Sequence, residues 1–208
     1  MNHISIEGMD GVGKSTVCKL LSERLDYEFV EKPLHFLFDR DENSFDEYLR
    51  IRDKVNINPN RNFTSWFYGL GSLYMYEMFK NKNIITDRHL VSNYAWSGTE
   101  NNGDVYELLL KKLGKPRLTV VLYAKPETIQ GRLSGRDDKD PDLKKIQKSE
   151  EIYHKMRTFC EEHDFNTLWI HTDHLSSEQI ADIIIRHLEK LDEGAPSSFK
   201  EVSMTEGQ

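Results

Sequence analysis

Short apolar runs alternate along this chain with longer stretches in which apolar residues recur every three or four positions. The short runs predict buried strands, and the periodic stretches predict amphipathic helices with one face against a sheet. The runs read as strands are residues 3–7, 27–31, 84–86, 118–123 and 167–171. Because helical stretches separate all of them, the pattern predicts an α/β fold with a five-stranded parallel sheet flanked by helices.

The helical periodicity ends close to the C-terminus, which sets the expected domain boundary. A chain of 208 residues is long enough for one globular domain with its own core. From residue 193 onward the sequence Glu-Gly-Ala-Pro-Ser-Ser is polar and aperiodic. We therefore expect one domain over residues 1–192 and a flexible polar tail over residues 193–208.

The balance of charge narrows the classes of partner. With 35 acidic and 28 basic residues the net charge is -7, which argues against binding to a nucleic acid polymer. No apolar run approaches the roughly 20 residues that span a bilayer, and the N-terminus lacks the pattern of a secretory signal. We expect a cytoplasmic protein that acts on a small molecule and does not associate with a membrane.

Residues 8–15 carry the clearest chemical signal. Their sequence, Gly-Met-Asp-Gly-Val-Gly-Lys-Ser, satisfies G-x-x-x-x-G-K-[ST] between a predicted strand and a predicted helix, which is the context this phosphate-binding motif requires. The loop predicts binding of ATP with Mg²⁺, in which Lys14 bridges the β and γ phosphates and the hydroxyl of Ser15 coordinates the metal. The expected nucleotide-binding residues are Gly8, Asp10, Gly11, Val12, Gly13, Lys14, Ser15 and Thr16.

A second polar group follows the strand at residues 84–86. Asp87 and Arg88 stand where that strand ends, on the same edge of the sheet as the loop. We expect Arg88 to bind a phosphate through its forked guanidinium group, and Asp87 to face Mg²⁺, directly or through a water molecule. Together with Lys14, these two residues are among the expected catalytic residues.

Over about residues 3–190 the chain resembles the thymidylate kinase family. Residues 7–16, EGMDGVGKST, look like the family's loop, and residues 87–96, DRHLVSNYAW, look like its DR[YH]-x-x-S-x-x-A-[YF] signature. The resemblance implies a P-loop kinase fold with a short lid at about residues 132–142. The activity it implies is transfer of the ATP γ-phosphate to a deoxynucleoside monophosphate, most simply dTMP to give dTDP.

The resemblance also assigns roles to single residues. Arg88 would hold the acceptor phosphate, Phe67 would stack on the base, and Trp96 would lie against the sugar and exclude a ribose 2′-hydroxyl. Arg132 and Arg136 of the lid would close onto the transferring phosphates. The substrate-binding residues that it implies are Asp10, Glu31, Phe67, Arg88, Ser92, Asn93 and Trp96. The family also implies a homodimer.

Two alternatives remain open. A deoxynucleoside kinase would act on an unphosphorylated nucleoside, with Glu31 as its general base. A nucleotide-binding switch without catalysis would need an N-K-x-D element, and residues 81–84 end in isoleucine instead. The base itself is not decided, because Gly71 stands where the family has the arginine that contacts thymine.

Overall fold

A six-stranded parallel sheet forms the centre of the molecule, in the order β2-β3-β1-β4-β5-β6. The computed structural model describes residues 1–37, 44–135, 141–194 and 200–202. The strands are β1 (His3–Glu7), β2 (Glu28–Glu31), β3 (Ile84–Asp87), β4 (Leu118–Tyr123), β5 (Thr167–His171) and β6 (Lys200–Val202). The α/β fold and its parallel sheet are confirmed, but the expected count of five strands is wrong.

The additional strand lies inside the segment that the sequence predicts to be a tail. Strand β6 pairs in parallel with β5, placing Lys200 beside Leu168 and Val202 beside Ile170. Three residues are too few to show an alternating pattern, which is why periodicity does not reveal this strand. The tail prediction is therefore wrong for residues 200–202, and residues 195–199 and 203–208 lie outside the described part of the chain.

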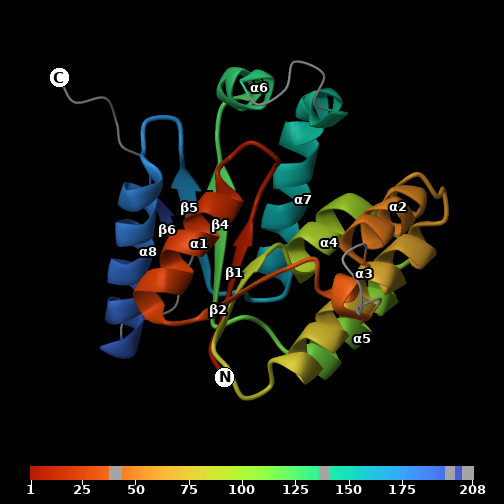
Figure 1. Cartoon of the computed structure of the whole chain (residues 1–208), viewed down its shortest axis with the longest axis horizontal. Helices are drawn as coiled ribbons and strands as arrows, with labels where there is room; N and C mark the ends of the chain where they lie inside the picture. The colour runs from red at the N-terminus through yellow and green to blue at the C-terminus, as the bar shows by residue number, and fades with distance from the viewer. Residues whose placement is uncertain (38–43, 136–140, 195–199, 203–208) are drawn as a thin grey trace.

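Helices cover both faces of the sheet (Figure 1). They are α1 (Lys14–Leu25), α2 (Ser44–Asn56), α3 (Arg61–Met78), α4 (Leu90–Ser97), α5 (Gly103–Leu113), α6 (Pro126–Ser134), α7 (Ser149–Glu162) and α8 (Ser177–Asp192), with short 3₁₀ helices η1 (Pro33–Leu37) and η2 (Pro141–Lys148). Helices α1 and α8 pack together on one side, while α4 packs on α7 and α3 on the other. None of the described helices is long and apolar enough to cross a membrane.

The position of β1 determines where a ligand can bind. Strand β1 lies between β3 and β4, with Ile6 beside Asp87 and Glu7 beside Val121. The chain passes from β1 to the β2–β3 side of the sheet and later returns to the opposite side through β4, so β1 and β4 flank the switch point of this topology. In open parallel sheets, ligands bind beyond the carboxyl ends of the strands at this point.

Two buried histidines lie at the β1–β3 side of the core. The rings of His3 and His89 meet edge to face at 4.7 Å. The Nδ1 and Nε2 atoms of His3 pair with the hydroxyls of Tyr76 and Thr86 at 2.6 and 2.9 Å, whereas neither ring nitrogen of His89 has a hydrogen-bond partner among the described residues. Burial lowers the pKa of His89 to about 3, and burial together with the neighbouring His89 lowers the pKa of His3.

These histidines predict a specific loss of stability in acid. Between about pH 6.5 and pH 3 the unfolded chain binds a proton at His89 that the folded chain does not, so the free energy of unfolding falls as the pH falls. The variant His89→Phe keeps an aromatic ring of similar size and cannot take up this proton. Urea unfolding at pH 7 and pH 5 should show that the variant escapes about 2 kcal/mol of the acid loss.

Parallel stability curves for the wild type and His89→Phe would show that His89 is protonated in the folded protein. The charged surface residues are common to both proteins, so their titration cancels in this comparison.

Candidate active site

The phosphate-binding loop adopts a conformation that its glycines make accessible. Gly8, Gly11 and Gly13 have φ angles of 133°, 85° and 97°, a region that other residues rarely enter. A Cβ atom on Gly8 would lie 2.2 Å from the carbonyl oxygen of Leu122, so the loop passes directly against β4. Helix α1 begins at Lys14 without a side-chain cap from Gly13, which leaves its first N–H groups to bind a phosphate.

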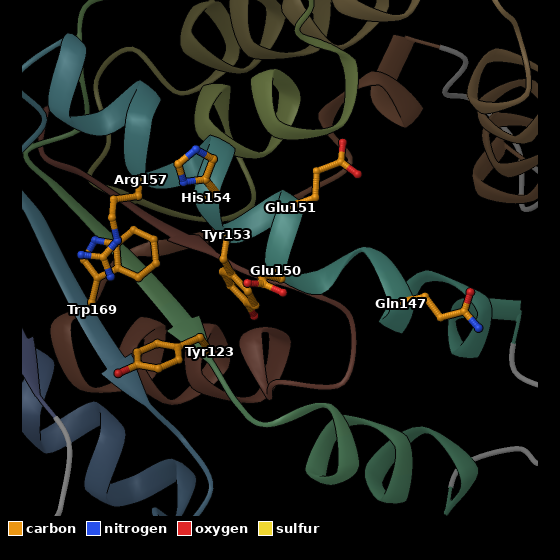
Figure 2. A pocket seen from close by; sticks show the side chains of 8 residues that line it. All are labelled: Tyr123, Gln147, Glu150, Glu151, Tyr153, His154, Arg157 and Trp169. Carbon is orange, nitrogen blue, oxygen red and sulfur yellow. The ribbon is translucent and has the colours of Figure 1, made fainter.

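Tyr153 of α7 holds the loop from the side. Its hydroxyl accepts a hydrogen bond from the backbone N–H of Met9 at 3.1 Å and donates one to the carbonyl oxygen of Leu122 at 3.0 Å. Figure 2 shows the Tyr153 side chain reaching from α7 toward the strand that carries Tyr123. Sequence reasoning missed this residue, because a tyrosine on a helix looks like any other core aromatic.

The predicted metal-binding residues lie together. The Ser15 hydroxyl donates to Asp87 Oδ2 at 2.6 Å, although the two residues are 72 positions apart in the sequence. A hydroxyl and a carboxylate are oxygen ligands of the kind that Mg²⁺ prefers, and Mg²⁺ usually completes its shell with phosphates and water. The donor set therefore fits Mg²⁺ bound with a nucleotide.

Lys14 lies beside the carboxylates of Asp10 and Asp87, which flank the loop. Its Nζ atom donates to the carbonyl oxygen of Met9 at 2.8 Å and lies 3.7 Å from Asp10 Oδ1 and 4.0 Å from Asp87 Oδ1. Burial and the nearby charge of Arg88 lower the pKa of Lys14, while Asp87 and Asp10 act in the opposite direction. This ammonium group is held at the start of α1, where phosphate would bind.

Arg88 closes the opposite side of the site. Its Nη2 donates to Asp10 Oδ1 at 2.7 Å, and its Nη1 lies 3.4 Å from the hydroxyl of Ser92. Burial raises the pKa of Asp10, but the charges of Arg88, Lys14 and Lys145 outweigh it and hold that pKa well below its usual range. Asp10 is therefore a carboxylate at neutral pH.

Lys145 is a site residue that sequence reasoning missed. It belongs to η2, and its Nζ lies 3.5 Å from Asp10 Oδ2, 2.6 Å from Asp142 Oδ1 and 5.7 Å from the ring centroid of Trp96. In the sequence it is one of several lysines in a charged segment, and no spacing rule distinguishes it. The fold brings it beside Asp10 and the ring of Trp96.

Arg132, one of the two predicted lid arginines, lies apart from this group. Arg132 donates through Nη1 to the hydroxyl of Thr172 at 3.0 Å and through Nη2 to the carbonyl oxygen of Thr172 at 2.7 Å. It therefore contacts the loop after β5 instead of Asp10 or Arg88. Arg136 and the middle of the predicted lid, residues 136–140, lie outside the described residues.

The predicted base-binding residues Phe67 and Asn93 lie in different surroundings, one half-buried and the other in the core. Phe67 is half-buried and stacks on Tyr48 at 6.3 Å with an angle of 11° between the rings. The Asn93 amide donates to the carbonyl oxygen of Ser65 at 3.1 Å, and its oxygen accepts from Tyr106 at 3.2 Å. The side chain of Asn93 is therefore engaged within the core.

Three other residues that the sequence predicts to belong to the site lie in the loop, on the first turn of α1 or at the edge of the sheet. Glu31 ends β2 beside Asp87 and pairs with Lys32 at 3.3 Å. Val12 is buried beneath the loop, and Thr16 is exposed on the first turn of α1. Their roles in binding stay predictions.

A cavity of about 680 Å³ lies elsewhere, beside α7 (Figure 2). Its walls are Tyr123, Gln147, Glu150, Glu151, Tyr153, His154, Arg157 and Trp169. None of the predicted site residues lines it, and Tyr153 is the residue it shares with the support of the loop. We place the chemistry at the loop and not in this cavity, because the loop carries the cations, the carboxylates and the free helix N-terminus that phosphoryl transfer needs.

A model of one protein family, described as thymidylate kinase, matches residues 6–183. The chain belongs to the thymidylate kinase family. A probable thymidylate kinase from Sulfolobus acidocaldarius is 27% identical over 159 residues, covering 72% of this chain and 79% of that protein. Another from Methanocaldococcus jannaschii is 26% identical over 197 residues, covering 90% and 96%. Membership of the thymidylate kinase family makes this chain an ATP-dependent phosphotransferase.

Solved structures agree on the fold. The thymidylate kinase of Candida albicans superposes with a TM-score of 0.65 at 16% identity, covering 93% of each chain. A deoxyadenosine kinase from M. mycoides gives a TM-score of 0.62 at 18% identity, covering 90% of this chain and 99% of that one. At these identities the likeness shows the P-loop kinase fold alone, which the sequence predicted.

The contacts of Tyr153 predict a defect on the nucleotide side. The variant Tyr153→Phe keeps the ring but leaves the N–H of Met9 and the carbonyl oxygen of Leu122 without their partner. The free energy of unfolding should fall by about 1–3 kcal/mol, the usual cost of unpaired buried polar groups. Steady-state kinetics should show a raised KM for MgATP, because the loop is less firmly held, with a smaller change in the KM for the acceptor.

A variant as stable as the wild type, with unchanged kinetics, would mean that the loop keeps its shape without Tyr153. Tyr123→Phe is the matched control: Tyr123 lines the same cavity, but its hydroxyl donates to Glu201 instead of contacting the loop.

Proposed function

We propose that this protein is a thymidylate kinase that transfers the γ-phosphate of ATP to dTMP, giving dTDP and ADP. The observation that carries the proposal is the convergence of Lys14, Ser15, Asp87 and Arg88 at one edge of the sheet. The family supports the activity, and the geometry supplies a cation for each of the two phosphates that must meet.

On the donor side, the N–H groups of the loop and the Nζ of Lys14 bind the β and γ phosphates. Bound Mg²⁺ would neutralise these phosphates, held by the hydroxyl of Ser15 with Asp87 facing it. On the acceptor side, Arg88 has five N–H donors, so the guanidinium that now contacts Asp10 can also hold the monophosphate. An acceptor phosphate oxygen then attacks the γ-phosphorus in line, and the surrounding cations stabilise the developing charge.

Lys145, which is one of the described residues, would supply a further cation near the acceptor. Its contact with Asp10 and its position over Trp96 support a role beside the acceptor sugar and phosphate. It complements the proposed role of the lid arginines, of which Arg132 would have to leave Thr172 to reach the phosphates.

Selection of the base rests on an aromatic surface. Phe67, stacked on Tyr48, would present its ring to the base, and Trp96 would exclude a ribose 2′-hydroxyl. Gly71 has no side chain that could contact the base in place of the family's arginine. It packs against Leu34, and an ideal Cβ at this position would lie 3.3 Å from Leu34 Cγ. The preference for thymine is therefore the most specific part of the proposal.

The deoxynucleoside kinase alternative is less well supported. It would use Glu31 as a base, and Glu31 is paired with Lys32 at the end of β2. The pairing of Arg88 with the carboxylate of Asp10 supports binding of an anionic group here, which a monophosphate supplies and a nucleoside does not.

A coupled ADP-release assay tests the function. MgATP is offered with dTMP, dUMP, dCMP, dGMP, the ribonucleotide UMP and thymidine. We expect turnover with dTMP above all others and none with thymidine. Lys14→Ala should lower kcat by orders of magnitude while the far-ultraviolet circular dichroism stays unchanged, because the lysine stabilises the transferring phosphate and not the core. Turnover of thymidine, or full activity of Lys14→Ala, would contradict the proposal.

We also propose a homodimer. Helix α3 exposes a stripe of apolar side chains at intervals of three and four residues: Phe63 at 48%, Trp66 at 45%, Leu70 at 49% and Leu73 at 52% exposure. Leu108 of α5 is also exposed, at 42%, and α5 packs on α3. Contiguous apolar surface on a helix usually marks a contact with another chain. The cytoplasmic location stays a prediction from the sequence.

Leu70→Glu tests the dimer. A carboxylate in the centre of the stripe would be buried unpaired in a dimer, so light scattering should show a fall in mass from twice 24.4 kDa to 24.4 kDa. Ile57→Glu is the matched control, since Ile57 is 82% exposed at the end of α2, outside the stripe. A monomeric wild type, or a dimer that survives Leu70→Glu, would count against this interface.

A further inference from the structure

The last residue of β1 is a carboxylate without any exposure to solvent. Glu7 is 0% exposed, and its Oε2 accepts hydrogen bonds from both the hydroxyl and the backbone N–H of Ser92, the latter at 3.2 Å. Its Oε1 has no partner among the described residues. The pKa of Glu7 is raised, because burial raises it by more than the hydrogen bonds from Ser92, the charge of Arg88 and the backbone N–H of His89 lower it. None of the roles proposed above uses this residue.

Glu7 serves as the cap of a helix that belongs to another part of the chain. Helix α4 has His89 at its N-cap, and the side chain of His89 makes no capping hydrogen bond. Ser92 is the third residue of α4, and its N–H is one of those that a helix leaves unpaired at its start. Glu7 binds this group from β1, so the first turn of α4 is fixed to the end of the strand that leads into the phosphate-binding loop.

Arg88 lies between the strand and that capped turn, in a strained backbone conformation. Its φ angle is 75°, the left-handed region that residues with a Cβ atom seldom adopt. On one side its N–H donates to the carbonyl oxygen of Ile6 at 2.9 Å. On the other side the chain turns into α4, which Glu7 holds through Ser92. Strain of this kind persists only where the surroundings determine it, and residues 6 and 7 supply both restraints.

We propose that Glu7 is the positioning residue for Arg88. By fixing the first turn of α4 from β1, its carboxylate keeps Arg88 in the left-handed conformation from which the guanidinium reaches the acceptor phosphate. The negative charge of Glu7 also attracts the guanidinium group of Arg88. Because β1 leads directly into the loop, the same strand sets the places of donor and acceptor phosphate.

The incomplete pairing of Glu7 argues for this role over a purely structural one. A buried carboxylate with one unpaired oxygen is a costly way to stabilise a core, and a neutral side chain of the same shape would be no worse for stability. A structural role and a positioning role therefore predict different outcomes when only the charge is removed.

The test measures the effect of Glu7→Gln twice, once in the wild-type protein and once in a protein that already carries Arg88→Lys. Glutamine keeps the shape and one acceptor oxygen, but a neutral oxygen accepts more weakly and does not attract the guanidinium. We expect the KM for dTMP to rise about tenfold, with the KM for MgATP within twofold and the melting temperature not lowered. In the Arg88→Lys background the further rise should be absent, because lysine cannot occupy the forked geometry that Glu7 maintains.

Three results would overturn the inference: an unchanged KM for dTMP in Glu7→Gln, equal losses for both substrates with a lower melting temperature, or full additivity with Arg88→Lys. Tyr153→Phe serves as a complementary control, because it should raise the KM for MgATP more than the KM for dTMP.

The inference rests on the proposed function, and the two can fail separately. Wild-type protein that does not phosphorylate dTMP would contradict the proposed function. Wild-type protein that does so, with a Glu7→Gln variant of unchanged KM, would contradict the role of Glu7 alone.

Discussion

Strand β1 pairs with β3 on one side and β4 on the other, and this pairing determines the geometry of the site. Because the strands are parallel, their carboxyl ends lie at one edge, and side chains from distant parts of the sequence meet there. Ser15 and Asp87 come within hydrogen-bonding distance for this reason. The contact of Gly8 with Leu122 and the hydrogen bond from Arg88 to Ile6 depend on the same register.

The site is also a balance of charges that no single residue provides. Lys14, Arg88 and Lys145 surround Asp10, and Asp87 lies beside Lys14. In the proposed mechanism these cations bind the phosphates, and the carboxylates of Asp10 and Asp87 balance their charge. Phosphates would then meet groups whose charge and position are already fixed, which would limit the reorganisation that transfer requires.

Sequence reasoning located the parts of the site that depend on chain order. The glycine loop lies between a strand and a helix, and Asp87 and Arg88 end a strand, so their meeting follows from parallel topology. The parts it missed depend on packing. Tyr153 and Lys145 reach the loop from elements whose placement no local pattern encodes, and Asn93 is drawn into the core by Ser65 and Tyr106. Strand β6 is too short to show an alternating pattern of apolar and polar residues.

Strand β6 also affects how this protein tolerates changes at its C-terminus. The strand covers the backbone edge of β5, and Glu201 accepts a hydrogen bond from Tyr123 at 2.7 Å. A chain cut after residue 194 would expose the N–H and C=O groups of an apolar strand that contains Leu168 and Ile170. Open strand edges of this kind recruit other strands and promote aggregation. Truncation or tagging near residue 200 therefore bears on solubility, although the residues concerned are remote from the phosphate-binding loop in the sequence.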